Sequence, residues 1–194
     1  MTRRSIIITA FTTTVVAVTA LVVVLAVRRQ PTPPAPAAAA ATAVAATPVS
    51  QGRKIKAQLF YVSDDGLRLV GVERDVPYAE QPVDQAREIM NAQLAPAVAP
   101  LVSAVPVGTA LRALFLTENG QAYVDLSRDV STAHPGGTLD EMLTIYTIVH
   151  ALTFNLPAVT AVQLLVDGKE VDTLAGHVDL RRPLAKSLQL AIED

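Results

Sequence analysis

A small set of histidines, aspartates and serines in the second half of the chain carries the side chains that acid–base, nucleophilic or metal chemistry would use. A histidine beside a carboxylate can bind a metal ion, or it can activate a serine as a nucleophile. The spacings match no metal-ligand pattern, and the chain has no G-x-S-x-G, P-loop or H-E-x-x-H motif. The sequence therefore predicts a protein that is not an enzyme and has no metal site or cofactor. The residues in question are His134, His150, His177, Asp125, Asp129, Asp179, Ser103, Ser127 and Ser131.

Asp125 and Ser127 stand at the end of a predicted strand and have two interpretations. They could seat a ligand or a neighbouring subunit. Short polar side chains at such positions also bind the backbone of the loop that follows, and we favour this second interpretation. Tyr146 could likewise be an exposed aromatic anchor or a core residue, and its place on an apolar helical face favours the core.

The segment of residues 138–152 is predicted to be the central helix of the fold and to carry His150. Its apolar residues recur at steps of three and four, as on one face of a helix. Thr138 and Glu141 have the spacing of a capping box, in which each side chain accepts a backbone N–H of the first turn. A packed or hydrogen-bonded imidazole is therefore favoured for His150. The apolar positions are Leu139, Met142, Leu143, Ile145, Tyr146, Ile148, Val149 and Leu152.

Three pairs of apolar segments, each joined at an Asp-Gly or Asn-Gly dipeptide, predict β-hairpins. A second helix is predicted to begin at Pro82, with an apolar stripe of Val83, Ala86, Met90 and Leu94. The resulting order predicts an α+β fold in which two helices pack on one face of a mainly antiparallel sheet built from three hairpins. The paired segments are residues 55–62 with 67–74, 111–116 with 121–126, and 161–166 with 170–174.

The first 28 residues predict a transmembrane signal-anchor. Residues 6–27 contain no charged side chain, and 22 residues of helix span about 33 Å, enough to cross a hydrocarbon core of about 30 Å. A cleavable secretory signal is the alternative, although the apolar run is longer than such signals usually have. Arginines flank both ends of the run, so charge does not fix its orientation.

Residues 29–52 are rich in proline and alanine and predict a linker, and residues 53–194 predict one globular domain. The domain has 12 basic against 18 acidic residues, because the four remaining arginines precede it. A net charge of −6 makes it a poor candidate for binding nucleic acid. The chain has no cysteine, which excludes disulfides, thiolate metal sites and N-terminal lipidation at cysteine.

Several short motifs resemble, in their order, the GerMN domain of bacterial sporulation and spore-germination proteins. The resemblance covers nearly all of residues 55–183. The chain departs from the lipoprotein members of that family, since it has no cysteine to acylate. The motifs are Phe60-Tyr61-Val62, Asp65-Gly66-Leu67, Val105-Pro106-Val107-Gly108-Thr109, the run from Asn119 to Ser127, Val166-Asp167-Gly168 and the run from Leu174 to Asp179.

The resemblance implies a non-catalytic envelope domain outside the cytoplasm, which in sporulating members resembles ring-building modules. We therefore expect a single-pass protein of the cell membrane that acts by self-association or by contact with other envelope proteins, in sporulation or germination. An accessory domain that binds an envelope ligand or a sensor protein is the alternative. Neither nucleic acid nor a small-molecule substrate is an expected partner.

Overall fold

The computed structural model describes residues 52–192 of the 194-residue chain. The predicted anchor, residues 1–28, and all of the predicted linker except Gly52 lie outside the described residues. Within residues 52–192, no helix has both the length and the apolar character needed to span a membrane.

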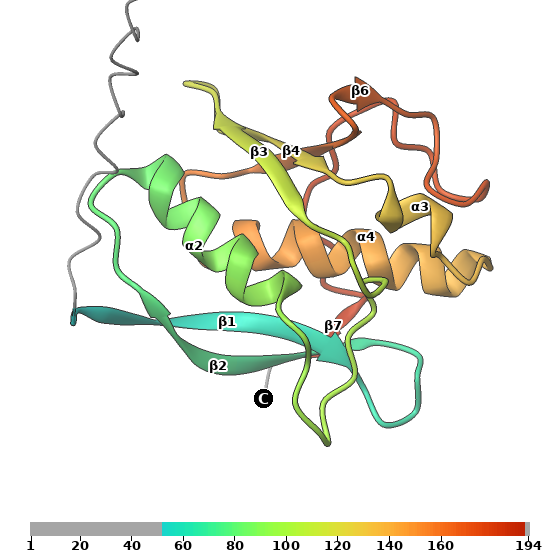
Figure 1. Cartoon of the computed structure of the whole chain (residues 1–194), viewed down its shortest axis with the longest axis horizontal. Helices are drawn as coiled ribbons and strands as arrows, with labels where there is room; N and C mark the ends of the chain where they lie inside the picture. The colour runs from blue at the N-terminus through green and yellow to red at the C-terminus, as the bar shows by residue number, and fades with distance from the viewer. Residues whose placement is uncertain (1–51, 193–194) are drawn as a thin grey trace, which may run out of the picture. The chain divides into compact units, whose positions relative to one another are not determined.

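The described residues form an α+β domain in which the two long helices lie between two β-sheets (Figure 1). One sheet has the strand order β1-β2-β7 and the other β3-β4-β5-β6. Helices α2 and α4 pack on each other and on strands of both sheets. The elements are β1 (Lys54–Val62), β2 (Leu69–Pro77), α2 (Pro82–Leu94), β3 (Leu111–Leu116), β4 (Gln121–Leu126), α3 (Asp129–Thr132), α4 (Thr138–Thr153), β5 (Ala161–Val166), β6 (Lys169–Glu170) and β7 (Ala191–Ile192).

The predicted single sheet is wrong, because the hairpins divide between two sheets. The β1–β2 hairpin is in one sheet, and β3 with β4 is in the other. β5 pairs with β4 in parallel, with α4 in the connection between them, since parallel neighbours need a long crossover. The turn dipeptides had predicted the local hairpins but carried no information on which hairpins share a sheet.

The predicted strand over residues 170–174 is also wrong beyond its first residue. Strand β6 ends at Glu170. The backbone N–H of Leu174 is turned to the carboxylate of Glu141 on α4 instead of to a neighbouring strand. The polar contact with the helix takes the place of a strand pairing, so this part of the chain becomes a loop that crosses from the sheet to the start of α4.

The core lies between the sheets, and this explains why α4 is buried more widely than a single apolar face would be. From Leu143 to Thr153 every residue of α4 except Tyr146 is buried. Leu139, predicted to lie on the packed face, is 37% exposed. The inward side chains of the second sheet alternate with outward ones, as a half-buried sheet requires. The inward residues include Leu114, Ala122, Val124, Leu126, Val162 and Leu164.

The outer edge of β1 is closed by two side-chain amides. The amide of Gln93 on α2 accepts the N–H of Phe60 at 2.8 Å and donates to its carbonyl at 2.9 Å. The amide of Asn155 makes the same two bonds with Gln58, at 2.8 and 2.7 Å. At the end of the same edge, Val62 pairs with Val102, which lies in the loop between α2 and β3. Backbone groups of an edge strand otherwise attract a second chain, so these contacts shield the edge.

Candidate functional site

The three histidines lie in three separate environments. His134 follows α3, His150 is on α4, and His177 is in the loop after β6. Among residues 52–192, no group of three or more histidine, aspartate or glutamate side chains is arranged to hold a metal ion.

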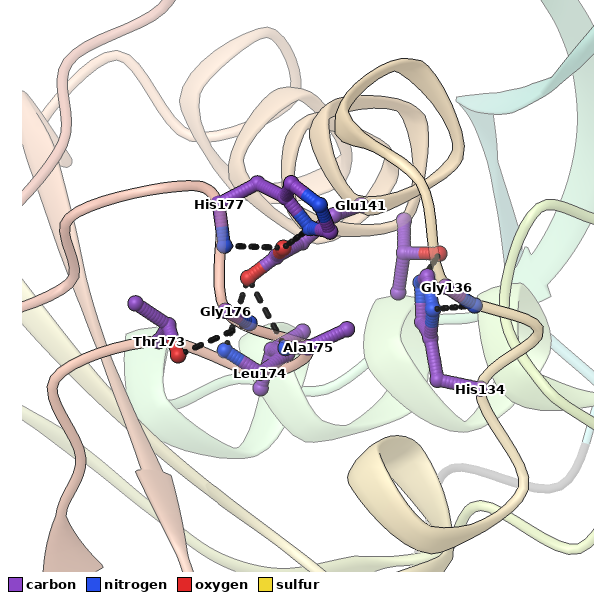
Figure 2. Close-up of polar contacts among 9 residues, drawn as sticks. His134, Gly136, Glu141, Thr173, Leu174, Ala175, Gly176 and His177 are labelled. Atoms are coloured by element: carbon purple, nitrogen blue, oxygen red, sulfur yellow. Dashed lines mark hydrogen bonds and ion pairs between the residues drawn. The ribbon is translucent and has the colours of Figure 1, made fainter.

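His134 fastens the turn that precedes α4. Its Nδ1 accepts the N–H of Gly136 at 2.9 Å, and its Nε2 lies 3.1 Å from the hydroxyl of Thr144 (Figure 2). That hydroxyl also donates to the carbonyl of Ala104 at 2.7 Å. The ring therefore links the turn before α4 to Thr144, whose hydroxyl in turn binds the long loop before β3, so these are structural contacts.

Glu141 is the polar residue of α4 with the most contacts, and it does not cap the helix as predicted. The residue at the N-cap position is Gly137, and no side chain caps the first turn. Glu141 is fully buried, on the same helical face as Ile145 and Ile148. Its actual partners are 33 to 36 residues away in the sequence.

The carboxylate of Glu141 holds the loop of residues 174–177 through four contacts (Figure 2). Oε1 accepts the N–H of Leu174 at 2.8 Å and that of Ala175 at 2.9 Å. Oε2 accepts the N–H of His177 at 2.8 Å, and the ring Nδ1 of the same residue lies 3.1 Å from it. We call this set of contacts the Glu141 clamp.

Electrostatics favour the charged form of Glu141 in the clamp. Burial by itself would raise the pKa of this carboxyl group, because a charge loses hydration inside a protein. The N–H groups of Ala175, His177 and Leu174, with the ring of His177, outweigh burial and hold the pKa below its ordinary value. The buried charge is therefore compensated by fixed donors, as buried charges generally must be.

The Glu141 clamp contains a histidine–carboxylate pair, the arrangement that a catalytic base would use. The Glu141 side chain has no exposed surface, whereas that of His177 is 41% exposed. Both carboxylate oxygens are already occupied by donors from the loop. This geometry holds a loop in place, and it leaves the carboxylate no free face toward a substrate.

Asp125 and Ser127 bind backbone, but of different segments. Asp125 accepts the N–H of Gly168 at 2.7 Å, so it fastens the β5–β6 turn, in which Asp167 has a φ of 50°. Ser127 accepts the N–H of Ala110 at 3.1 Å and donates to Asp129 at 2.9 Å. The predicted attachment of these side chains to the backbone of the following loop is therefore wrong, and only the bond from Ser127 to the side chain of Asp129 reaches that loop.

The remaining candidate side chains make local contacts. Asp179 forms a salt bridge with Arg181 at 2.7 Å, and both side chains are largely exposed. The hydroxyl of Ser103 accepts the N–H of Val105 at 3.1 Å. Ser131 lies in the short helix α3. No two of these residues meet at a common point, so they do not form a site.

A hollow of about 390 Å³ opens beside the β1–β2 connection. Two of its polar side chains are bound within their own loop: the Ser63 hydroxyl donates to Asp65 at 2.6 Å, and Asp65 accepts the N–H of Leu67 at 3.0 Å. The hollow contains no histidine. Its lining residues are Tyr61, Val62, Ser63, Asp64, Asp65, Val70 and Leu101.

Sequence reasoning missed Glu141, Gln93 and Asn155 as the side chains that hold distant backbone. A signal for Glu141 was present: a charged residue stood three or four residues from apolar positions on the most buried helical face. Such a residue needs a partner when the face is covered. The sequence could not show which backbone would supply that partner.

Comparisons with known proteins agree with the fold. A family model described as "Germane: Sporulation and spore germination" matches residues 58–172. The first GerMN domain of the sporulation protein GerM from Bacillus subtilis has a similar structure, with a TM-score of 0.53 and 17% identity over 70% of this chain and 98% of that one. The tandem GerMN domains of the same protein give a TM-score of 0.54 and 16% identity over 69% of this chain. The matched part is 46% of the tandem chain. No curated protein sequence matches.

Proposed function

The chain belongs to the sporulation and spore germination family of Germane, or GerMN, domains, and from this membership we propose that it is a non-catalytic assembly module of the bacterial cell envelope. The observation that carries the proposal is the family match over residues 58–172. In this proposal residues 1–28 anchor the protein in the cell membrane, and residues 29–52 hold the domain away from the lipid on its outer side.

Two features of the domain support a role in binding proteins. The buried side chains of Glu141 and Gln93, and the partly buried side chain of Asn155, bind the protein's own backbone. Apolar side chains at the surface include Phe115, which is 57% exposed on β3, and Val107, which is 94% exposed in the preceding loop. Exposed apolar side chains are the groups that protein contacts usually bury.

An accessory ligand-binding domain is the second candidate, and the hollow beside Asp64 and Asp65 is the observation that favours it. Binding pockets bring a few polar groups together toward a ligand. Asp65 is bound instead by Ser63 and the backbone of its own loop. Assembly through the surface is therefore the better-supported proposal.

Photocrosslinking of the full chain in the membranes of its own host tests the assembly proposal. A crosslinking amino acid is placed at Phe115 or Val107, and at Asn119, an exposed polar residue, as the matched control. Two copies with different tags are expressed together, so that a crosslinked product carrying both tags identifies self-association.

We expect a product with both tags from at least one apolar position and none from Asn119. Failure at both apolar positions would contradict self-association through them. Protease added to intact, wall-stripped cells tests the topology separately. It should digest the domain, and a fully protected domain would contradict the proposed placement outside the membrane.

A further inference from the structure

The last described segment, residues 185–192, lies against α4 and β2 with few polar contacts. The N–H of Ser187 donates to Nε2 of His150 at 3.2 Å. The N–H of Leu69 donates to the carbonyl of Leu190 at 2.8 Å, and the two residues of β7 then pair in parallel with Leu69 and Val70. We call residues 185–192 the tail.

His150, which receives the tail, is fully buried in a cluster of aromatic rings. The centres of its ring and those of Phe60 and Phe154 are 5.2 Å apart, and that of Tyr146 is at 5.3 Å. Because Nε2 accepts a hydrogen bond, the single proton of the neutral ring must be on Nδ1. Nδ1 is buried and has no hydrogen-bond partner.

The ionisable groups around His150 offer nothing to stabilise a positive ring. The facing residue of β1 is Phe60, that of α4 is Tyr146, and Phe154 follows the end of α4. The tail contributes Lys186, whose ammonium lies 5.0 Å from the centre of the Phe154 ring. A proton on Nε2 would point at the donating N–H of Ser187, and it would place a second positive charge near Lys186.

We propose that His150 is a protonation-controlled latch for the tail: the neutral ring holds residues 185–192 in place, and the cationic ring releases them. Release removes β7 from the edge of β2 and frees the N–H of Leu69. The latch is a conformational property of the domain, and it does not depend on the proposed assembly function. Burial lowers the pKa of His150 to about 4 and the charge of Lys186 adds to this shift, while the backbone of Ser187 opposes it, so the tail is docked at neutral pH and released in acid.

Distance measurements between pairs of spin labels on the full chain in detergent test the latch. The chain has no cysteine, so labels attach only where cysteine is introduced. One pair reports on the tail through Gln189→Cys and Asn91→Cys, and the other reports on the remaining domain through Glu118→Cys and Asn91→Cys. All three positions are exposed.

Between pH 7 and pH 4 we expect the distance distribution of the tail pair to broaden, while that of the domain pair stays narrow. A tail pair that stays narrow at pH 4 would overturn the proposal. Broadening of both pairs at the same pH would also overturn it, because acid would then unfold the whole domain.

Two variants connect the effect to His150. His150→Phe keeps an aromatic ring but removes the acceptor, so the tail pair should be broad at pH 7 and independent of pH. Lys186→Gln leaves the buried cluster intact and should move the midpoint of release to higher pH; a move to lower pH would contradict the latch. His177→Gln, a change of a histidine that does not contact the tail, is the matched control and should keep the wild-type midpoint.

Discussion

The two ends of α4 hold two different segments of the chain, and they do so with different chemistry. Near its start, Glu141 holds the loop of residues 174–177 through a charged carboxylate and four contacts. Near its end, His150 holds the tail through one ring nitrogen and one N–H. Both groups accept hydrogen bonds only when they are unprotonated at the accepting atom.

The difference lies in how easily each contact is lost. Hydrogen bonds to a carboxylate are about twice as strong as bonds between neutral groups. The Glu141 clamp also lowers the pKa of its carboxyl group, so it stays charged over most of the accessible pH range. The same helix therefore provides a permanent attachment at one end and a conditional one at the other.

Glu141→Ala should give the largest loss of stability. The change leaves buried backbone N–H groups without an acceptor, so we expect the free energy of unfolding to fall by about 3–5 kcal/mol. Urea denaturation of the full chain in detergent measures the loss. Asp140→Ala, an exposed acid of the same turn, should stay within about 0.5 kcal/mol of wild type. A loss below about 1 kcal/mol for Glu141→Ala would mean that the clamp adds little.

Acid should separate the two attachments by their pH windows. The folded pKa of His150 is about 4, below its unfolded value of 6.5, so the unfolded state takes up its proton first. Stability should therefore fall as the pH falls from 6.5 to 4, by at most about 3 kcal/mol, and less when tail release lets the ring titrate in solvent.

The folded pKa of Glu141 is also lowered, from 4.5. Its contribution is fully present above pH 4.5 and is lost as the pH falls through the folded pKa. A plot of unfolding free energy against pH, measured from pH 3 to pH 7, should thus show two ranges in which stability falls as the pH falls. His150→Phe should reduce the pH dependence in the higher range, and Glu141→Gln should reduce it in the lower range. Loss of the pH dependence in both ranges in either variant would contradict separate attachments.

The contrast between the two ends of α4 was not visible in the sequence, although much of the fold was. Apolar periodicity predicted β3, β4 and β5 with the bounds that the structure has, the start of α2 at Pro82, and α4 to within one residue. Periodicity reports which face of an element is buried, and it does not report what covers that face. The division into two sheets was therefore not predicted. It depends on the parallel pairing of β4 with β5, which α4 separates in the sequence.

The error at Glu141 has the same cause. A capping box is a local pattern, and residues 138–141 do have its Thr-x-x-Glu spacing. The carboxylate finds more donors in a distant loop, at 2.8–2.9 Å, than the helix start would offer. Tertiary contacts overrode a local preference, and the sequence contains no spacing rule that links residues 33 to 36 positions apart.

Gln93 offers an intermediate case between the charged clamp and the single bond of His150. It is fully buried and makes two neutral hydrogen bonds to Phe60. Gln93→Leu has a similar volume but leaves an N–H and a carbonyl unpaired, so stability should fall by about 1–3 kcal/mol. Asn91→Leu, at an exposed position of α2, is the control for urea denaturation. A loss larger than that of Glu141→Ala would reverse the expected ranking.

His177→Ala tests which donors carry the Glu141 clamp, and it should have the smallest effect. The change removes the half-exposed ring but keeps the backbone N–H, which remains 2.8 Å from Oε2. Three of the four contacts survive, so we expect a loss below about 1 kcal/mol. Double-mutant analysis with Glu141→Gln measures the coupling between the two side chains. A coupling above about 2 kcal/mol would show that the contact between the two side chains dominates, and the strength of the clamp would then depend on the ring of His177 instead of on the loop backbone.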